Sequence, residues 1–127
     1  MGYPHYSSDC YEHWKVATIC GSMRFYPQML VAAERLTLEG WMVLMPFVRK
    51  DKAMDPGNLD YQTRLAREGS VASIADFLDA MHKKKIDLSR QIVVVSDGSG
   101  YIGDSTRSEI EYAQQHGKSI VYSYEEA

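Results

Sequence analysis

The chain has 127 residues, with 14 Lys and Arg against 17 Asp and Glu, and a formal net charge of −3. That length is enough for one domain with a hydrophobic core and too short for two. A slightly acidic chain lacks the basic surface that usually binds long nucleic acid, so we expect no such partner. No apolar run approaches the roughly 18 residues of a membrane span, and the start lacks the apolar core of a signal peptide. We therefore expect no membrane partner and a cytoplasmic location.

The first residues differ in character from the rest of the chain. Residues 1–14 are polar and aromatic without a period, and we interpret them as an N-terminal extension of a single domain over residues 15–127. The two cysteines do not make a disulfide framework; Cys20 closes an apolar run, which indicates a buried thiol. Cys10 and His13 would form only half of a metal site, and no second pair completes it. We therefore expect no bound metal.

The domain opens with a strand, a helix and a second strand. Residues 15–20 (KVATIC) are typical of a strand, and a turn at 21–24 follows. Helical spacing of apolar residues then runs from about Pro27 to Gly40, a C-cap glycine, and residues 41–47 form another apolar run. Two strands joined by a helix form a crossover unit, which predicts that the strands are parallel.

A long polar connection separates the two halves. Residues 48–70 have mixed composition, which predicts a mobile flap over the strand ends, with a short helix near 61–67. Helical spacing resumes over 71–89, and the run of lysines at 83–85 marks a possible break and a solvated face.

The second half repeats the alternation of strand and helix. Residues 91–96 (QIVVVS) are rich in β-branched side chains, which is typical of a strand covered on both faces. A helix is expected from Asp104 to about His116, and a last strand at 118–124. The alternation predicts an α/β fold with an open parallel sheet of four to five strands flanked by helices, a Rossmann-like or flavodoxin-like three-layer sandwich.

In such folds ligands bind beyond the carboxyl ends of the strands, where the strand order reverses. This rule predicts a site in which residues 21–24 face residues 97–109. The glycines of the second segment, Gly98, Gly100 and Gly103, permit a tight loop with positive φ. Asp104, Ser105 and Thr106 offer N-cap oxygens for the following helix, whose N-terminus favours anions and polar sugars as ligands.

Four side chains near this site allow two interpretations each. Glu109 can face a ligand, or it can form a capping box with Thr106. The spacing alone favours the capping box. Ser22 and Arg24 can hold a phosphate or a sugar hydroxyl, or they can form a solvated surface turn. His82 can be an acid or base, although a lone helical histidine is more often a partly exposed surface residue.

Two further patterns bear on the ligand. Residues 98–103 match the dinucleotide fingerprint G-x-G-x-x-G between a strand and a helix. That fingerprint belongs at the first strand of a larger domain, whereas one strand remains here, so a dinucleotide-binding protein is the weakest of our alternatives. Tyr101 and Tyr112 could stack on a nucleobase, but tyrosines also simply pack.

Four segments carry a resemblance: ICGSMRF after the first strand, HKKKIDL before the third, then YIGDSTRSEIEYA and HGKSIVY. Together they resemble the nucleoside 2-deoxyribosyltransferase-like superfamily, which contains deoxyribosyltransferases and nucleoside 5′-monophosphate N-glycosidases. The resemblance spans residues 15–124 and is closest to short bacterial and phage members. It implies cleavage or transfer at an N-glycosidic bond, with Glu109 as the nucleophile that forms a glycosyl-enzyme ester, and no cofactor.

The resemblance also implies roles around Glu109. Gly21, Ser22 and Arg24 match a phosphate and sugar contact, while Ser105 and the backbone of Gly100 to Gly103 would cradle an anion. Asp97 and Tyr101 complete the expected substrate-binding set.

Two of the chain's departures from the family bear directly on the site. His82 stands where the family has an aspartic acid that protonates the leaving base, and Arg107 replaces a small residue, so it could bind a phosphate or block the pocket. These departures leave open a non-catalytic nucleotide-binding or sensor module. Family members assemble at least as dimers, so a homodimer or higher homo-oligomer that binds a small nucleoside or nucleotide is expected.

Overall fold

The computed structural model describes residues 14–48 and 71–126. The expected extension up to residue 13 lies outside the described residues, and so do Cys10 and His13 within it. The expected flap and its short helix, over residues 49–70, lie outside them too.

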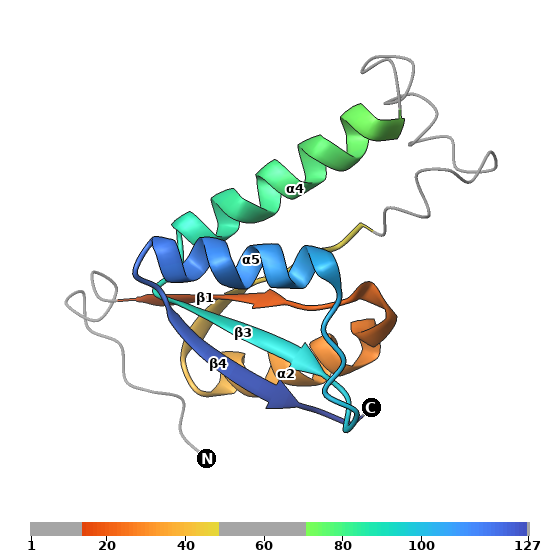
Figure 1. Ribbon diagram of the computed structural model, residues 1–127. Coiled ribbons are helices and arrows are strands. Elements are labelled where there is room, and N and C mark those ends of the chain that lie inside the picture. The colour runs from red at the N-terminus through yellow and green to blue at the C-terminus, as the bar shows by residue number, and fades with distance from the viewer. Residues whose placement is uncertain (1–13, 49–70, 127) are drawn as a thin grey trace.

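Four parallel strands form the middle layer (Figure 1). They are β1 (Lys15–Cys20), β2 (Trp41–Leu44), β3 (Gln91–Ser96) and β4 (Ser119–Tyr124), in the order β2-β1-β3-β4. In register, Thr18 of β1 pairs with Ile92 of β3. The expected α/β fold is confirmed, with the lower of the two expected strand numbers among the described residues. The second strand ends at Leu44 rather than at Phe47.

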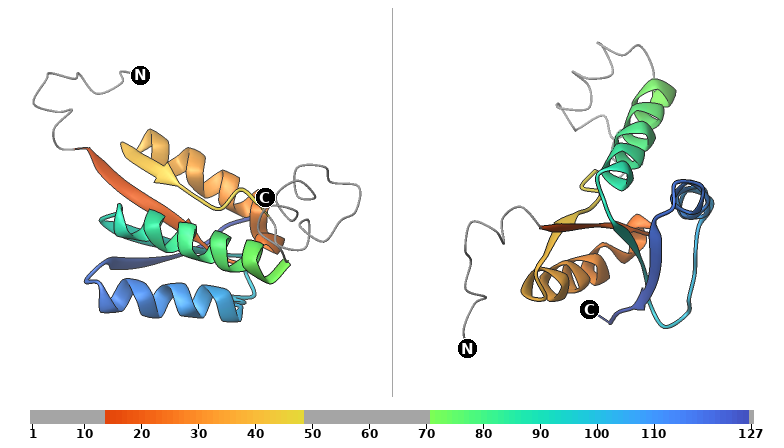
Figure 2. Two further views of the ribbon diagram at one scale, coloured as in Figure 1. Left: turned by 90° about the horizontal axis from the view of Figure 1, so that it is seen from above. Right: turned by 90° about the vertical axis from the view of Figure 1, so that its left-hand side faces the viewer.

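Helices cover both faces of this sheet (Figure 2). The short turn η1 (Met23–Phe25) leads into α2 (Tyr26–Leu38) on one face, and α4 (Val71–Asp87) and α5 (Asp104–Gln115) lie side by side on the other. None of the described helices is long and apolar enough to cross a membrane. The chain leaves β1 toward the face covered by α2, and it leaves β3 toward the face covered by α5. The strand order therefore reverses between β1 and β3. The expected ligand position lies at their carboxyl ends.

Each face of the sheet has its own apolar core. Under α2 the buried side chains are Ala17, Ile19, Met29, Ala32, Leu36, Met45, Val93 and Val95. Under α4 and α5 they are Cys20, Ile86, Ile92, Val94, Ile110 and Ala113. Successive residues of β1 and β3 point to opposite faces, so these strands contribute to both cores and are buried throughout their inner length.

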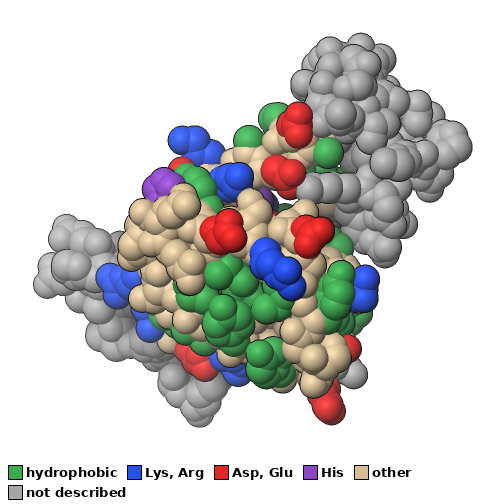
Figure 3. All heavy atoms as spheres, viewed as in Figure 1, with side chains coloured by type: hydrophobic (Ala, Val, Ile, Leu, Met, Phe, Trp, Pro, Cys, Tyr) green, Lys and Arg blue, Asp and Glu red, His purple; other side chains and the backbone are tan. Residues whose placement is uncertain are grey.

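The outer strand β4 is less covered. Val121, Tyr122 and Tyr124 expose 43%, 48% and 59% of their surface. Figure 3 shows apolar side chains gathered over this strand. The homo-oligomer expected from the resemblance stays a prediction.

The break expected near residues 83–85, in the helix over residues 71–89, is wrong. Helix α4 runs without interruption through the three lysines to Asp87. Lysine is a good helix former, so the sequence itself supports this continuity. The lysines are not one solvated face either: Lys84 is exposed, whereas the Nζ of Lys85 donates a hydrogen bond to the carbonyl oxygen of Met45, at 2.8 Å.

The start of α5 also differs from expectation. The N-cap residue is Gly103, in an extended conformation with φ −81° and ψ 174°, and no side chain caps the helix. The expected capping oxygens of Asp104, Ser105 and Thr106 are therefore inside the first turn. The backbone N–H of Arg107 bonds the Gly103 carbonyl at 3.0 Å, which fixes this start. Of the three loop glycines only Gly100 has a positive φ, 72°.

This start excludes the capping box. A capping-box glutamate lies three residues after the N-cap, and with Gly103 as the N-cap that position is Thr106. Glu109 is the sixth residue of α5, more than one turn inside the helix, where backbone N–H groups already have helical partners. Its carboxylate is thus available for a role other than capping.

Candidate active site

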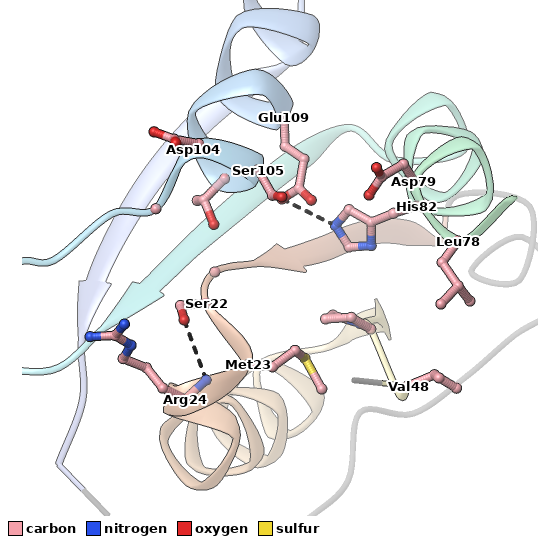
Figure 4. A pocket seen from close by; sticks show the side chains of 14 residues that line it. Ser22, Met23, Arg24, Val48, Leu78, Asp79, His82, Asp104, Ser105 and Glu109 are labelled. Atoms are coloured by element: carbon pink, nitrogen blue, oxygen red, sulfur yellow. Dashed lines mark hydrogen bonds and ion pairs between the residues drawn. The ribbon is translucent and has the colours of Figure 1, made fainter. Parts of the chain in front are cut away.

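A cavity of about 460 Å³ lies where the strand order reverses. The turn after β1 forms one side of it, and α4 and the start of α5 form the other (Figure 4). Its lining comprises Gly21, Ser22, Met23, Arg24, Pro46, Val48, Leu78, Asp79, His82, Gly103, Asp104, Ser105, Thr106 and Glu109. The size suits a ligand of nucleoside or nucleotide dimensions.

Glu109 reaches this cavity from α5. Ile110 and Ala113 of the same helix are buried against the sheet, so the adjacent Glu109 lies at the border between core and cavity. Its side chain is 15% exposed and points toward His82 in Figure 4. Its carboxylate therefore borders the space that a ligand in the cavity would occupy.

His82 faces Glu109 from α4. Its Nε2 lies 3.6 Å from Oε2 of Glu109, and its side chain is 8% exposed. Ile86, one turn further along α4, is fully buried and holds this face of the helix on the sheet. The interpretation of His82 as an exposed surface residue is therefore wrong.

Cys20 lies behind this pair, at the end of β1. Its Sγ is 3.3 Å from Nε2 of His82. Burial raises the pKa of the Cys20 thiol well above its usual value, and the negative charge of Glu109 and a hydrogen bond to it raise the pKa further. The expected buried thiol is confirmed, and it remains protonated beside the carboxylate.

Ser22 and Arg24 form the opposite wall. Ser22 is the N-cap of η1, and its Oγ accepts a hydrogen bond from the Arg24 backbone N–H at 3.4 Å. The Arg24 guanidinium lies 4.0 Å from the centre of the Tyr101 ring, a cation–π contact that limits where this charge can go. The exposed cation is thus held at the edge of the cavity.

The cavity brings together most of the residues predicted from sequence. Gly21, Ser22, Arg24, His82, Gly103, Ser105 and Glu109 line it. Asp97, Gly100, Tyr101 and Arg107 are not among its lining residues. Of these four, Tyr101 contacts the lining residue Arg24.

Asp97 lies close by. Hydrogen bonds from the Ser99 side chain and backbone lower the pKa of Asp97, and the charge of Arg24 adds a smaller effect in the same direction. Arg107 is exposed on α5, and Tyr112 packs on His116 and bonds Asp87 at 2.6 Å, so Tyr112 joins α5 to α4.

Some lining residues were not predicted. Asp79 lies three residues before His82, a spacing that places both on one face of α4 and could have indicated it. The apolar part of the wall, Met23, Pro46, Val48 and Leu78, comes from three separate segments, and no local pattern marks it.

Fold and site together describe an α/β protein with a carboxylate, an imidazole and a cationic edge at the switch point of its sheet. No family model matches the chain, and no match is found among curated proteins. Among solved structures, the chain is similar to a 2-desoxiribosyltransferase from Leishmania mexicana, with a TM-score of 0.45 and 16% identity. The alignment covers 85% of this chain and 63% of that one, so this chain spans less than two thirds of that protein.

Proposed function

We propose that this chain cleaves or transfers at the N-glycosidic bond of a nucleoside or nucleoside 5′-monophosphate, with Glu109 as the nucleophile. The observation that supports this most is the position of Glu109. It lies too deep in α5 to cap the helix, and it lines the cavity beside His82. The sequence resemblance gives the same residue the same role.

The proposed reaction has two steps. One oxygen of the Glu109 carboxylate bonds to the anomeric carbon as the bond to the base nitrogen breaks, and the base leaves with that electron pair. The sugar is then held as an ester on Glu109. Water or the nitrogen of a second base attacks the same carbon and frees the carboxylate. A negative charge beside an oxocarbenium-like transition state stabilises both steps.

The leaving base needs a proton, and we assign its delivery to His82. An imidazole can give up a proton near neutral pH, and this ring borders the cavity at 3.6 Å from the nucleophile. In its protonated form it also attracts the Glu109 carboxylate and so orients it. In this chain the histidine would take the place of the carboxylic acid that the resembling family uses.

The other end of the cavity fits the sugar and a phosphate. Arg24 supplies a cation, Ser22 and Ser105 supply hydroxyls, and the α5 N-terminus at Gly103 supplies a partial positive charge. Gly100, Tyr101 and Asp97 would act indirectly, by shaping the loop and holding Arg24. Arg107 is exposed beside this end, and we propose no direct contact for it.

The test is base release from a panel of nucleosides and 5′-monophosphates, followed by chromatography. We expect release by the wild type and none by Glu109→Gln, which keeps the shape of the side chain. The matched control is Glu111→Gln, an exposed glutamate two residues further along α5, which should retain full activity. Melting temperatures within a few degrees would show that all three proteins are folded.

Three outcomes would contradict the proposal. Equal release by wild type and Glu109→Gln would assign the activity to another group. If the wild type binds nucleotides without releasing base, the chain is a sensor module. A melting temperature that rises with NAD but with none of the nucleosides or 5′-monophosphates would favour the dinucleotide-binding alternative.

A further inference from the structure

Three side chains from separate elements converge behind the cavity. Cys20 ends β1, His82 lies on α4 and Glu109 lies on α5. One ligand atom of each, a thiol sulfur, an imidazole nitrogen and a carboxylate oxygen, lie within 4.8 Å of one another. Cys20 is fully buried and His82 is 7% exposed, so the packing of three elements fixes their positions.

The two distances from His82 match those around one tetrahedral ion. Zinc binds sulfur at about 2.3 Å and nitrogen or oxygen at about 2.0 to 2.2 Å. Tetrahedral angles then place two ligand atoms about 3.3 to 3.6 Å apart. The His82 Nε2 lies 3.3 Å from Cys20 Sγ and 3.6 Å from Glu109 Oε2. Little movement would be needed to place an ion between them.

The donor types select the metal. Sulfur and imidazole nitrogen favour zinc and similar transition metals, whereas magnesium and calcium prefer oxygen throughout. A thiolate and a carboxylate would balance the two positive charges of the ion. The thiol proton would leave to solvent on binding, as in other cysteine sites.

We propose that Cys20, His82 and Glu109 bind one zinc-type divalent ion, with its fourth position open to the cavity. His82 and Glu109 line the cavity, which gives the ion its path, while Cys20 closes the site from behind. Three protein ligands and one open position are typical of zinc sites that also bind a water or a small ligand.

Such an ion would control the activity proposed above. A Glu109 oxygen that coordinates zinc cannot attack a sugar, and a His82 nitrogen that coordinates zinc cannot deliver a proton. Zinc should therefore inhibit base release, and a chelator should restore it. This consequence rests on the proposed function, whereas the binding itself does not.

The first measurement uses cobalt as a probe on the full, chelator-treated chain. Tetrahedral Co²⁺ bound to a thiolate gives strong visible bands and a near-ultraviolet sulfur-to-cobalt band. We expect both at one equivalent per chain, and their loss when zinc displaces the cobalt. Absence of a sulfur-to-cobalt band would overturn the proposal.

The chain offers a matched control because it has two cysteines, Cys10 and Cys20. Cys20→Ser should abolish the sulfur-to-cobalt band and weaken zinc binding at least about tenfold, since losing even a supporting partner costs 10- to 100-fold. Cys10→Ser should keep both the sulfur-to-cobalt band and the wild-type affinity for zinc. A band that follows Cys10, or wild-type affinity in Cys20→Ser, would overturn the proposal.

A second variant covers the case in which Cys20→Ser does not fold. Glu109→Gln should keep the sulfur-to-cobalt band and weaken zinc binding at least about tenfold. Unchanged affinity there would contradict the site.

The two proposals fail separately. Cobalt bands without base release from any substrate would support the metal site and contradict the proposed glycosidase activity. Base release that zinc does not inhibit, without cobalt bands, would do the reverse.

Discussion

The two faces of the sheet are built from the same strands but differ in chemistry. Among the described residues, those that are buried under α2 are apolar. The face under α4 and α5 buries Thr18, Cys20, His82, Ser96 and Thr106 as well. Alternating residues of one strand contribute to the two faces in turn: at the end of β1, Ile19 is buried under α2 and Cys20 under α4 and α5. Both faces therefore hold an apolar core, and the face under α4 and α5 adds a buried polar cluster to its own.

After Glu109 itself, the largest effect is expected at His82, also on the polar face. His82→Asn should lower base release by about 10²- to 10⁴-fold, because the leaving base loses its proton donor. Substrates whose leaving group needs no proton should be affected far less. The measurement is kcat/KM on both kinds of substrate. An equal loss on both would make His82 a positioning residue for Glu109 instead.

A deletion on the apolar face should act on stability alone. Leu36→Ala in α2 removes a side chain that is 3% exposed and should lower the free energy of unfolding by about 2 to 5 kcal/mol. Urea denaturation measures this. Base release per folded molecule should stay within a few-fold of the wild type. A loss as large as that of His82→Asn would show that the two faces are not separable.

Gly21 joins the two faces, and its substitution should affect both moderately. A Cβ there would meet the Val95 carbonyl oxygen at 2.6 Å and the Met29 side chain at 3.0 Å. Gly21→Ala should therefore cost about 1 to 3 kcal/mol and weaken base release, because the turn carrying Ser22 must shift. The control is Gly98→Ala, where a Cβ meets nothing within 4 Å and the change should stay within about 0.5 kcal/mol. Equal costs would contradict this account.

The sequence predicts best what depends on neighbours along the chain. The β-branched run of β3 and the glycine turn after β1 specify buried strands and the place where they end, and parallel topology then fixes the site. The start of α5 was harder because Asp104, Ser105 and Thr106 all offer capping oxygens, yet the backbone of Gly103 takes the position.

Contacts between distant segments leave no local signal. Cys20 and His82 are 62 residues apart in sequence and meet only because β1 and α4 pack together. A lone histidine on a helix is more often partly exposed, so the sequence alone favoured a surface position for His82. The apolar wall has the same origin, since Pro46 follows β2 and Leu78 lies on α4. Such residues become predictable only once the order of the strands is known.

The smallest effect is expected at the rim of the apolar face, where Arg35 of α2 bonds Glu125 at 2.8 Å. A hydrogen bond from Ser123 lowers the pKa of Glu125 most, and Arg35 lowers it further. A carboxylate with a lowered pKa stabilises the fold above its unfolded pKa, and this contribution disappears as the pH falls through the folded value. Glu125→Gln should thus cost up to about 1 kcal/mol at pH near 7 and almost nothing in strong acid.

Urea denaturation at both pH values measures this difference. Glu39→Gln is the matched control, because Glu39 also pairs with Arg35 but at 3.4 Å and with 49% of its side chain exposed. It should cost less than Glu125→Gln at neutral pH. If the cost of Glu125→Gln were the same in acid, the side chain would contribute by packing rather than by charge. The rim of the apolar face would then resemble its core, and the polar chemistry of the molecule would be confined to the other face.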